Sequence, residues 1–279
     1  MTRSFGHPVI DAWVQPWTPE IVRGMPERNF ALLDRYGGSS AIRSGLPLEA
    51  IVEGMDAAGV DRALCSAGPL IPVEAVDEAV RRWPDRLVGI GTANPYTPDG
   101  VMAAVEELRR QVEVLGFRGL KMEPFLLDRE PTEAQWYPLY AACVDLGVAV
   151  QFQVGNTGPP TYSSHTGRPL LIDRIAVDFP ELHIVAGHIG WPWTEEMLAI
   201  AWKHPNVWID TSAHLPKHFP DSFVHFLKTF GSDTCIWASD WPILDFERCL
   251  TQVGALGLSD DVTRKFLCDN ALAAFGLDA

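Results

Sequence analysis

Polar side chains stand at the ends of several apolar, strand-like runs in this chain. His188 follows such a run at residues 183–187, and Asp240 follows another at residues 235–239. A carboxylate beside an imidazole orients the ring and raises its pKa, so that the imidazole can give or take a proton near neutrality. We therefore predict that His188 and Asp240 form an acid–base pair. The structural alternative for each residue is a hydrogen bond to a loop.

Lys121 also lies in an apolar run, at residues 117–122. An ammonium group is costly to bury there unless it meets an anion. That anion is either a neighbouring carboxylate, Glu123 or Asp240, or the carboxylate or oxyanion of a substrate. The sequence leaves both possibilities open. We count Lys121 as a catalytic candidate and Glu123 as a binding candidate.

Neutral polar and aromatic residues occur beside the same strand ends, and we expect them to bind substrate. The polar ones are Gln15, Gln153, Asn156 and Ser212, and the tryptophans are Trp13, Trp191 and Trp241. The amides can polarise a substrate carbonyl, or they can simply bond to one another. The tryptophans can form the walls of a pocket for a flat, partly apolar substrate, or they can belong to the core.

Strand-like and helix-like segments alternate from end to end, which is the pattern that could bring these residues together. The predicted strands are residues 9–14, 62–65, 87–92, 117–122, 149–154, 183–187, 207–210 and 235–239. Helices are predicted at residues 48–58, 73–83, 99–115, 135–146 and 171–179, from about 194, and from 259 to about 275. Glycine or proline follows several of these helices, as is common at helix ends.

Eight strand–helix units predict an α/β fold, a (β/α)8 TIM barrel that forms one domain over residues 1–279. A doubly wound open sheet is the alternative, but no glycine-rich phosphate loop follows the first strand. In a barrel the catalytic groups lie at the carboxyl ends of the strands. Two long connections, 16–47 and 155–169, should lie on that face as lids or pocket walls.

Composition restricts the partners and the compartment. The net charge of −14 argues against nucleic acid and anionic membranes as partners, because both favour a basic surface. No signal segment or transmembrane run is evident, and the five cysteines show no CxxC pairing. We therefore expect a cytoplasmic protein that acts on a small molecule. The sequence also permits a homodimer.

The order of motifs resembles the amidohydrolase superfamily. The similarity is to its amidohydrolase-related group, which includes aminocarboxymuconate-semialdehyde decarboxylase, aromatic-acid decarboxylases and lactonases. The motifs that carry the resemblance are Ile10-Asp11, Gly119-Leu120-Lys121, Gly187-His188-Ile189-Gly190-Trp191-Pro192-Trp193, residues 205–212 (PNVWIDTS) and Ala238-Ser239-Asp240-Trp241-Pro242. The resemblance implies a (β/α)8 barrel in which the strand-six histidine, His188, acts as acid or base. It also implies one divalent metal, bound by His-x-His on strand one, a histidine on strand five and an aspartate on strand eight.

This chain departs from the family pattern at the metal ligands. The positions that match His-x-His are Trp13 and Gln15, the strand-five position is Gln153, and only Asp240 remains. Imidazole, thiolate and carboxylate groups bind zinc and similar ions, usually three or four together, and an indole is no ligand. We therefore expect no metal ligands and no cofactor. A weak alternative is a divalent metal such as zinc at Asp240, His188 and Glu123.

These residues predict a metal-independent hydrolase. It would act on a small cyclic or aromatic lactone, ester or amide, with Asp240 and His188 activating water and Lys121 stabilising the oxyanion. One alternative is a lyase of secondary metabolism, such as a non-oxidative decarboxylase or a cyclase, in which His188 transfers a proton. Another is a binding protein without catalytic activity.

Overall fold

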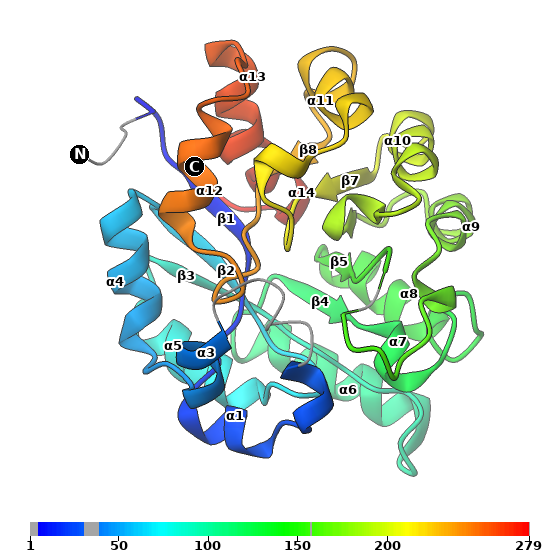
Figure 1. The fold of residues 1–279 in the computed structure, drawn as a ribbon. Coiled ribbons are helices and arrows are strands. Elements are labelled where there is room, and N and C mark those ends of the chain that lie inside the picture. The colour runs from blue at the N-terminus through cyan, green and yellow to red at the C-terminus, as the bar shows by residue number, and fades with distance from the viewer. Residues whose placement is uncertain (1–4, 31–38, 157, 279) are drawn as a thin grey trace.

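Eight parallel strands alternate with helices in the structure, a computed structural model that describes residues 5–30, 39–156 and 158–278 (Figure 1). The predicted (β/α)8 barrel is confirmed. The strands are β1 (Ile10–Val14), β2 (Arg62–Ser66), β3 (Leu87–Ile90), β4 (Gly119–Met122), β5 (Ala149–Phe152), β6 (Ile184–Ala186), β7 (Val207–Asp210) and β8 (Cys235–Ile236). Each strand starts within two residues of the predicted start. Most end at the predicted end or up to three residues before it, because the pairing is shorter than the apolar runs, and β2 extends one residue further.

Two hydrogen-bonded groups of strands, β1-β2-β3 and β4-β5-β6-β7-β8, make up the barrel. Short seams join them. Gly91 bridges β3 to β4 by donating to the Gly119 carbonyl at 2.8 Å. On the other side, the Asp240 amide donates to the Trp13 carbonyl at 3.0 Å, and the Gln15 amide donates to the Trp241 carbonyl at 2.8 Å. The β8–β1 seam therefore passes through the predicted site.

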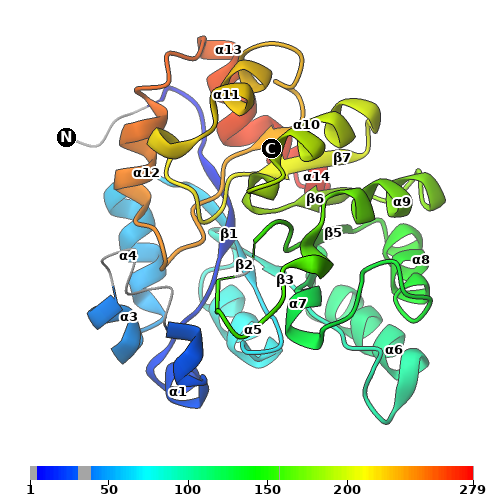
Figure 2. The same cartoon turned by 45° about the vertical axis from the view of Figure 1, so that its right-hand side comes forward.

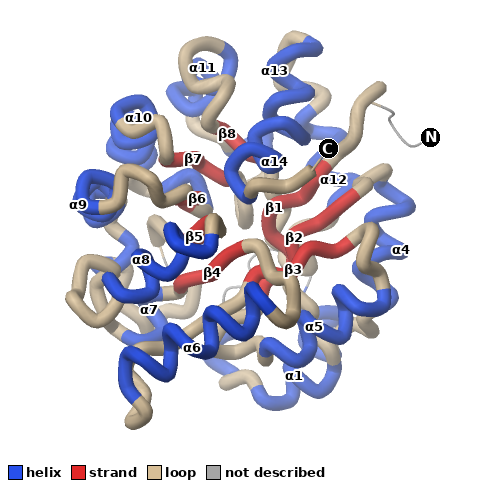
Figure 3. The backbone as a smooth tube through the Cα atoms, turned by 180° about the vertical axis from the view of Figure 1, so that it is seen from behind, coloured by secondary structure: helices blue, strands red, loops and turns tan. Residues whose placement is uncertain are grey.

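Helices surround the strands on the outside, as the view from behind shows (Figure 3). The helices that follow the strands are α4 (Glu49–Ala58), α5 (Val73–Arg82), α6 (Gly100–Glu113), α8 (Tyr137–Leu146), α9 (Leu170–Asp178), α10 (Thr194–Lys203), α11 (Asp221–Lys228) and α12 (Phe246–Val253). Gly59 ends α4 in the left-handed region, at φ 78°, as its position after the apolar pattern predicts. No helix in the described ranges is long and apolar enough to cross a membrane.

Alternate strand residues pack on opposite sides of the barrel wall, as a period of two requires. Ile10 and Leu64 belong to an inner cluster, whereas Ala63 and Cys65 pack outward in the larger layer beneath the helices. The last helix, α14 (Asn270–Phe275), contributes Phe275 to the inner cluster. It therefore closes the end of the barrel that lies opposite the predicted site (Figure 3).

The single long helix predicted after residue 259 is divided into three parts. Ser259 caps α13 (Asp260–Arg264), a wider π turn follows at Lys265–Asp269, and α14 completes the segment. Phe266, Leu267 and Cys268 are all buried. A regular α-helix cannot direct three successive side chains to one side, and the wider turn accommodates them.

Short helices occupy the connections that we expected on the catalytic face. Residues 16–47 contain α1 (Pro19–Gly24), a 3-10 turn (Glu27–Phe30) and α3 (Ser39–Ser44), with α1 and α3 in contact (Figure 2). Part of this connection, residues 31–38, lies outside the described residues. After β4, the short helix α7 (Pro124–Leu127) contacts the 3-10 turn His165–Gly167 of the second long connection.

Candidate active site

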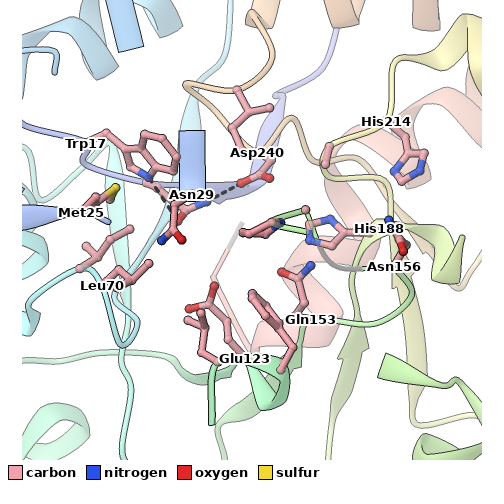
Figure 4. Close-up of a pocket in the computed structure, with 18 of the residues that line it drawn as sticks. Trp17, Met25, Asn29, Leu70, Glu123, Gln153, Asn156, His188, His214 and Asp240 are labelled. Carbon is pink, nitrogen blue, oxygen red and sulfur yellow. Dashed lines mark hydrogen bonds between the residues drawn. The ribbon is translucent and has the colours of Figure 1, made fainter. Parts of the chain in front are cut away.

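A cavity of about 360 Å³ opens at the carboxyl ends of the strands (Figure 4). Seven of the eleven predicted site residues line it, namely Gln15, Glu123, Gln153, Asn156, His188, Trp191 and Asp240. Trp17, Met25 and Leu70 form an apolar side opposite His188. The cavity is therefore polar on one side and apolar on the other, which suits a flat ligand with a few polar substituents.

His188 enters the cavity directly after β6. The preceding Gly187 is required there, because a Cβ atom would lie 2.8 Å from the Trp13 ring. The Nδ1 atom of His188 lies 3.0 Å from the Ser212 carbonyl oxygen and 2.7 Å from the Ser212 hydroxyl. A carbonyl oxygen only accepts, so Nδ1 carries the proton and Nε2 presents a lone pair.

Asp240 does not orient His188 as predicted. The partner of the imidazole is Ser212, and no hydrogen bond joins His188 to Asp240 among the described residues. The predicted rise in the pKa of His188 is also wrong. Burial, with smaller effects of His214 and Lys121, lowers the pKa of His188 to about 3, so the ring is neutral.

Asp240 instead accepts a hydrogen bond from Gln15 Nε2 at 2.5 Å. Burial raises the pKa of this carboxyl well above its usual value, and the charge of Lys121 and the bond from Gln15 oppose that rise only in part. Burial thus favours the protonated form of Asp240. A buried neutral carboxyl group is a proton donor rather than a base.

Lys121 lies below the cavity with its side chain fully buried. Its Nζ atom lies 3.6 Å from Glu123 Oε2, 3.4 Å from Gln15 Oε1 and 4.7 Å from the centroid of the Trp13 ring. Lys121 lines a second cavity, of about 390 Å³, which shares Glu123 with the first. The structural partner that we considered, Glu123, is therefore present. Lys121 lines the second cavity, and its ammonium group contacts Gln15 and Glu123, which line the first.

The other predicted residues lie behind the cavity surface. Trp13 is fully buried and packs beneath His188, with ring centroids 5.0 Å apart. Ser212 lies behind the same imidazole. Trp241 is stacked on Phe246 at 5.9 Å, so it belongs to the core rather than to the cavity wall.

Two buried carboxyls hold the backbone that carries the site. Asp210 accepts hydrogen bonds from the Ser212 amide at 2.9 Å and from the Ser212 hydroxyl, and burial raises its pKa to about 6. Asp11 accepts hydrogen bonds from the Trp13 amide at 2.9 Å and the Ser239 amide at 3.1 Å, and burial raises its pKa to about 7. These groups position the loops and do not line the cavity.

His214 and several apolar residues line the cavity without having been predicted to do so. The only sequence signal for His214 was its place four residues after the end of β7. Its position depends on Ala213, which has a φ of +59°. His188 and Asp240 have positive φ as well, at 60° and 64°. Three non-glycine residues in this uncommon conformation thus line one cavity, as occurs at functional sites.

Comparisons with known proteins identify the family and agree with the barrel fold. A family model described as "Amidohydrolase" matches residues 10–277. The γ-resorcylate decarboxylase of Rhodococcus jostii is 26% identical over 254 residues, which are 74% of this chain and 75% of that protein. An uncharacterized TIM-barrel protein from Bordetella bronchiseptica has a TM-score of 0.82 at 24% identity, covering 96% of this chain and 99% of that one. The 5-carboxyvanillate decarboxylase of Novosphingobium aromaticivorans has a TM-score of 0.75 at 19% identity, covering 99% of both chains.

The last of these structures overturns our expectation about cofactors. The 5-carboxyvanillate decarboxylase was crystallised with bound manganese and 3-methoxy-4-hydroxy-5-nitrobenzoic acid. The prediction of no cofactor, which rested on the replaced histidines, is contradicted by this finding. Sequence departures at individual ligands are an insufficient basis for excluding an ion from a site of this family.

The residues present here nevertheless fit such an ion poorly. No group of three or more His, Cys, Asp or Glu side chains able to hold a metal occurs in the described part of the chain, so the suggested zinc site at Asp240, His188 and Glu123 is not formed. Gln15 bonds to Asp240, and the Lys121 ammonium contacts both Gln15 and Glu123. A cation and an amide thus lie where oxygen and nitrogen ligands would be needed.

Proposed function

Because the chain belongs to the amidohydrolase family, we propose that it is a carbon–carbon lyase that decarboxylates a small aromatic carboxylic acid without an oxidant. The chain is an enzyme of a family whose members are hydrolases and lyases. One observation carries the proposal. Asp240, whose burial favours the protonated form, accepts a hydrogen bond from Gln15 and lies near the Lys121 cation at a cavity with an apolar wall.

The proposed reaction needs one proton and no water. Asp240 donates its proton to the ring carbon that bears the carboxylate. The bond between that carbon and the carboxylate then breaks, its electron pair returns to the ring, and carbon dioxide leaves. Solvent returns a proton to Asp240. Lys121 attracts the carboxylate or an adjacent oxyanion, and the neutral His188 accepts a hydrogen bond through Nε2.

Binding in the apolar part of the cavity favours this reaction. A carboxylate is strongly solvated in water, whereas carbon dioxide is not, so removal of water destabilises the charged reactant relative to the product. Trp17, Met25 and Leu70 supply that apolar surface. We assign no step to a metal ion, since the donor groups described above do not match one.

The electrostatics favour decarboxylation over the hydrolysis that we predicted first. Activation of water requires an ionised Asp240 or a basic His188. Burial raises the pKa of Asp240, which disfavours its ionised form. Burial lowers the pKa of His188, which makes the imidazole a weak base. The relatives with decarboxylase names support the same choice.

The proposal is tested by measuring carbon dioxide release from 2-hydroxybenzoate and 2,6-dihydroxybenzoate. Asp240→Asn should abolish release, because the amide cannot supply the proton. Asp221→Asn makes the same chemical change on the exposed surface of α11 and should leave the rate unchanged. Release that persists in Asp240→Asn would refute the role of Asp240. A wild-type protein that binds these acids but releases no carbon dioxide would instead support a binding protein without catalytic activity.

A further inference from the structure

Two imidazoles share one hydrogen-bond acceptor at the edge of the cavity. His188 Nδ1 and His214 Nδ1 each lie 3.0 Å from the carbonyl oxygen of Ser212. Both residues line the cavity, on the side opposite the apolar residues (Figure 4). One backbone carbonyl therefore fixes the orientation of two rings that come from different loops.

This arrangement determines which nitrogen of each ring carries a proton. The Ser212 carbonyl oxygen can only accept, so both Nδ1 atoms are donors. In a neutral ring the remaining nitrogen, Nε2, is then an acceptor with an open lone pair. Neither Nε2 atom has a hydrogen-bond partner among the residues that the structure describes.

Both rings are also held in the neutral form. Burial is the largest cause that lowers the pKa of His188 and of His214, and their proximity adds to the effect at His188. Protonation would place two positive charges beside each other and near Lys121. The pair therefore presents two acceptors and no donor to a ligand in the cavity.

We propose that His188 and His214 form a subsite that binds a hydroxyl substituent of the aromatic acid, with His214 selecting its position on the ring. The orientation of the ligand rests on the proposed function, in which the carboxylate lies toward Lys121. Two lone pairs attract an O–H donor and repel a second carboxylate. The subsite thus selects hydroxylated monocarboxylates and rejects aromatic dicarboxylates.

Two substitutions at position 214 distinguish the role of Nε2, which accepts from the ligand, from that of Nδ1, which donates to the Ser212 carbonyl. In His214→Asn the amide can still donate to the Ser212 carbonyl, but nothing occupies the place of Nε2. The glutamine side chain in His214→Gln is longer than that of asparagine and can bring its amide oxygen near the position of Nε2. Calorimetry would measure the dissociation constants of benzoate, its three monohydroxy isomers and benzene-1,3-dicarboxylate for each protein.

We expect the wild-type protein to bind one hydroxybenzoate about 3- to 10-fold more tightly than benzoate, the contribution of about one neutral hydrogen bond. This preference should fall to within about twofold in His214→Asn and recover in part in His214→Gln. Equal binding of benzoate and all its hydroxy isomers, no binding of any, or an unchanged preference in His214→Asn would overturn the proposal. So would a dicarboxylate that binds as tightly as the best hydroxybenzoate.

Nitrogen NMR of the histidines in the unsubstituted enzyme provides a measurement that does not depend on how well a variant folds. Both rings should show the Nδ1–H tautomer, and the hydroxybenzoate that binds most tightly should shift at least the His214 Nε2 signal. An Nε2–H tautomer at His214 would contradict the subsite. Selective binding without carbon dioxide release would leave the subsite intact and refute only the decarboxylase proposal. Carbon dioxide release with a binding preference that does not depend on His214 would support the decarboxylase proposal and refute the subsite.

Discussion

Replacing Ser212 by alanine tests how the site is held together. The hydroxyl donates to Asp210 and accepts from His188 Nδ1, whereas the Ser212 carbonyl and amide remain in the variant. His188 should therefore keep its tautomer through the carbonyl. The main loss of folding stability should arise at Asp210, which loses a hydrogen bond. This carboxyl is fully buried, and its second oxygen, Oδ2, has no partner in the described structure.

The size of that loss should depend on pH. In the wild-type protein the pKa of Asp210 is raised to about 6, and the Ser212 hydroxyl is one of the groups that keep it from rising further. Below that pH the carboxyl is protonated and the lost bond is neutral, worth about 1 kcal/mol. Above that pH the carboxylate is ionised, and the lost hydrogen bond to a charged group is worth about 2–3 kcal/mol. Without the hydroxyl the folded-state pKa moves higher, so the extra loss of stability develops as pH rises above about 6.

Urea unfolding at about pH 5.5 and pH 8, followed by tryptophan fluorescence, measures this difference. Ser66→Ala is the matched control, because Ser66 is equally buried but bonds to the neutral Gln151 side chain at 3.3 Å. Its loss of stability should not change with pH. A loss in Ser212→Ala that is equal at both pH values, or larger at the lower one, would refute the assignment of Asp210.

Three further predictions concern the cavity. The kcat/KM for decarboxylation should fall as pH rises through the raised pKa of Asp240, because only the protonated form donates; a rate that increases with pH would contradict this. Lys121→Met should weaken benzoate binding by about tenfold or more in calorimetry, since a charge-assisted contact is lost, while Lys121→Arg should retain part of it. The double variant Gln15→His/Gln153→His should raise the affinity for manganese at least about tenfold in spin-resonance titrations, because even outer-shell partners change metal affinity by that factor. Unchanged affinity would mean that these two positions do not face one ion.

The sequence was sufficient to predict the barrel and the face on which the cavity opens. Apolar runs that end in polar residues mark the strands, and a period of two predicts Asp11, Trp13 and Gln15 on one side of the first strand. The structure departs from that alternation, because the register of β1 against β2 shifts between Asp11 and Val14. Gln15 reaches the cavity, whereas Trp13 lies under it and Asp11 binds backbone amides.

The hydrogen-bond partners could not be predicted, because they depend on the paths of loops. His188 is held by the carbonyl of Ser212, which no side-chain pattern can reveal. His214 enters the site through the left-handed conformation of Ala213, which alanine rarely adopts and which therefore leaves no sequence signal. The pKa of Asp240 depends on complete burial, a property of the packed structure rather than of the motif around it.

The β8–β1 seam has a consequence for the dynamics of the enzyme. Gln15 and Asp240 lie at this seam, and their own amides make two of the backbone bonds that close it. Opening the seam would separate the proton donor from its amide partner and disrupt the cavity. A ligand that binds only the closed form must then slow hydrogen–deuterium exchange at these two amides, by a factor of one plus the ratio of its concentration to its dissociation constant. Exchange at the seam thus reports occupancy of the cavity without any chemical turnover.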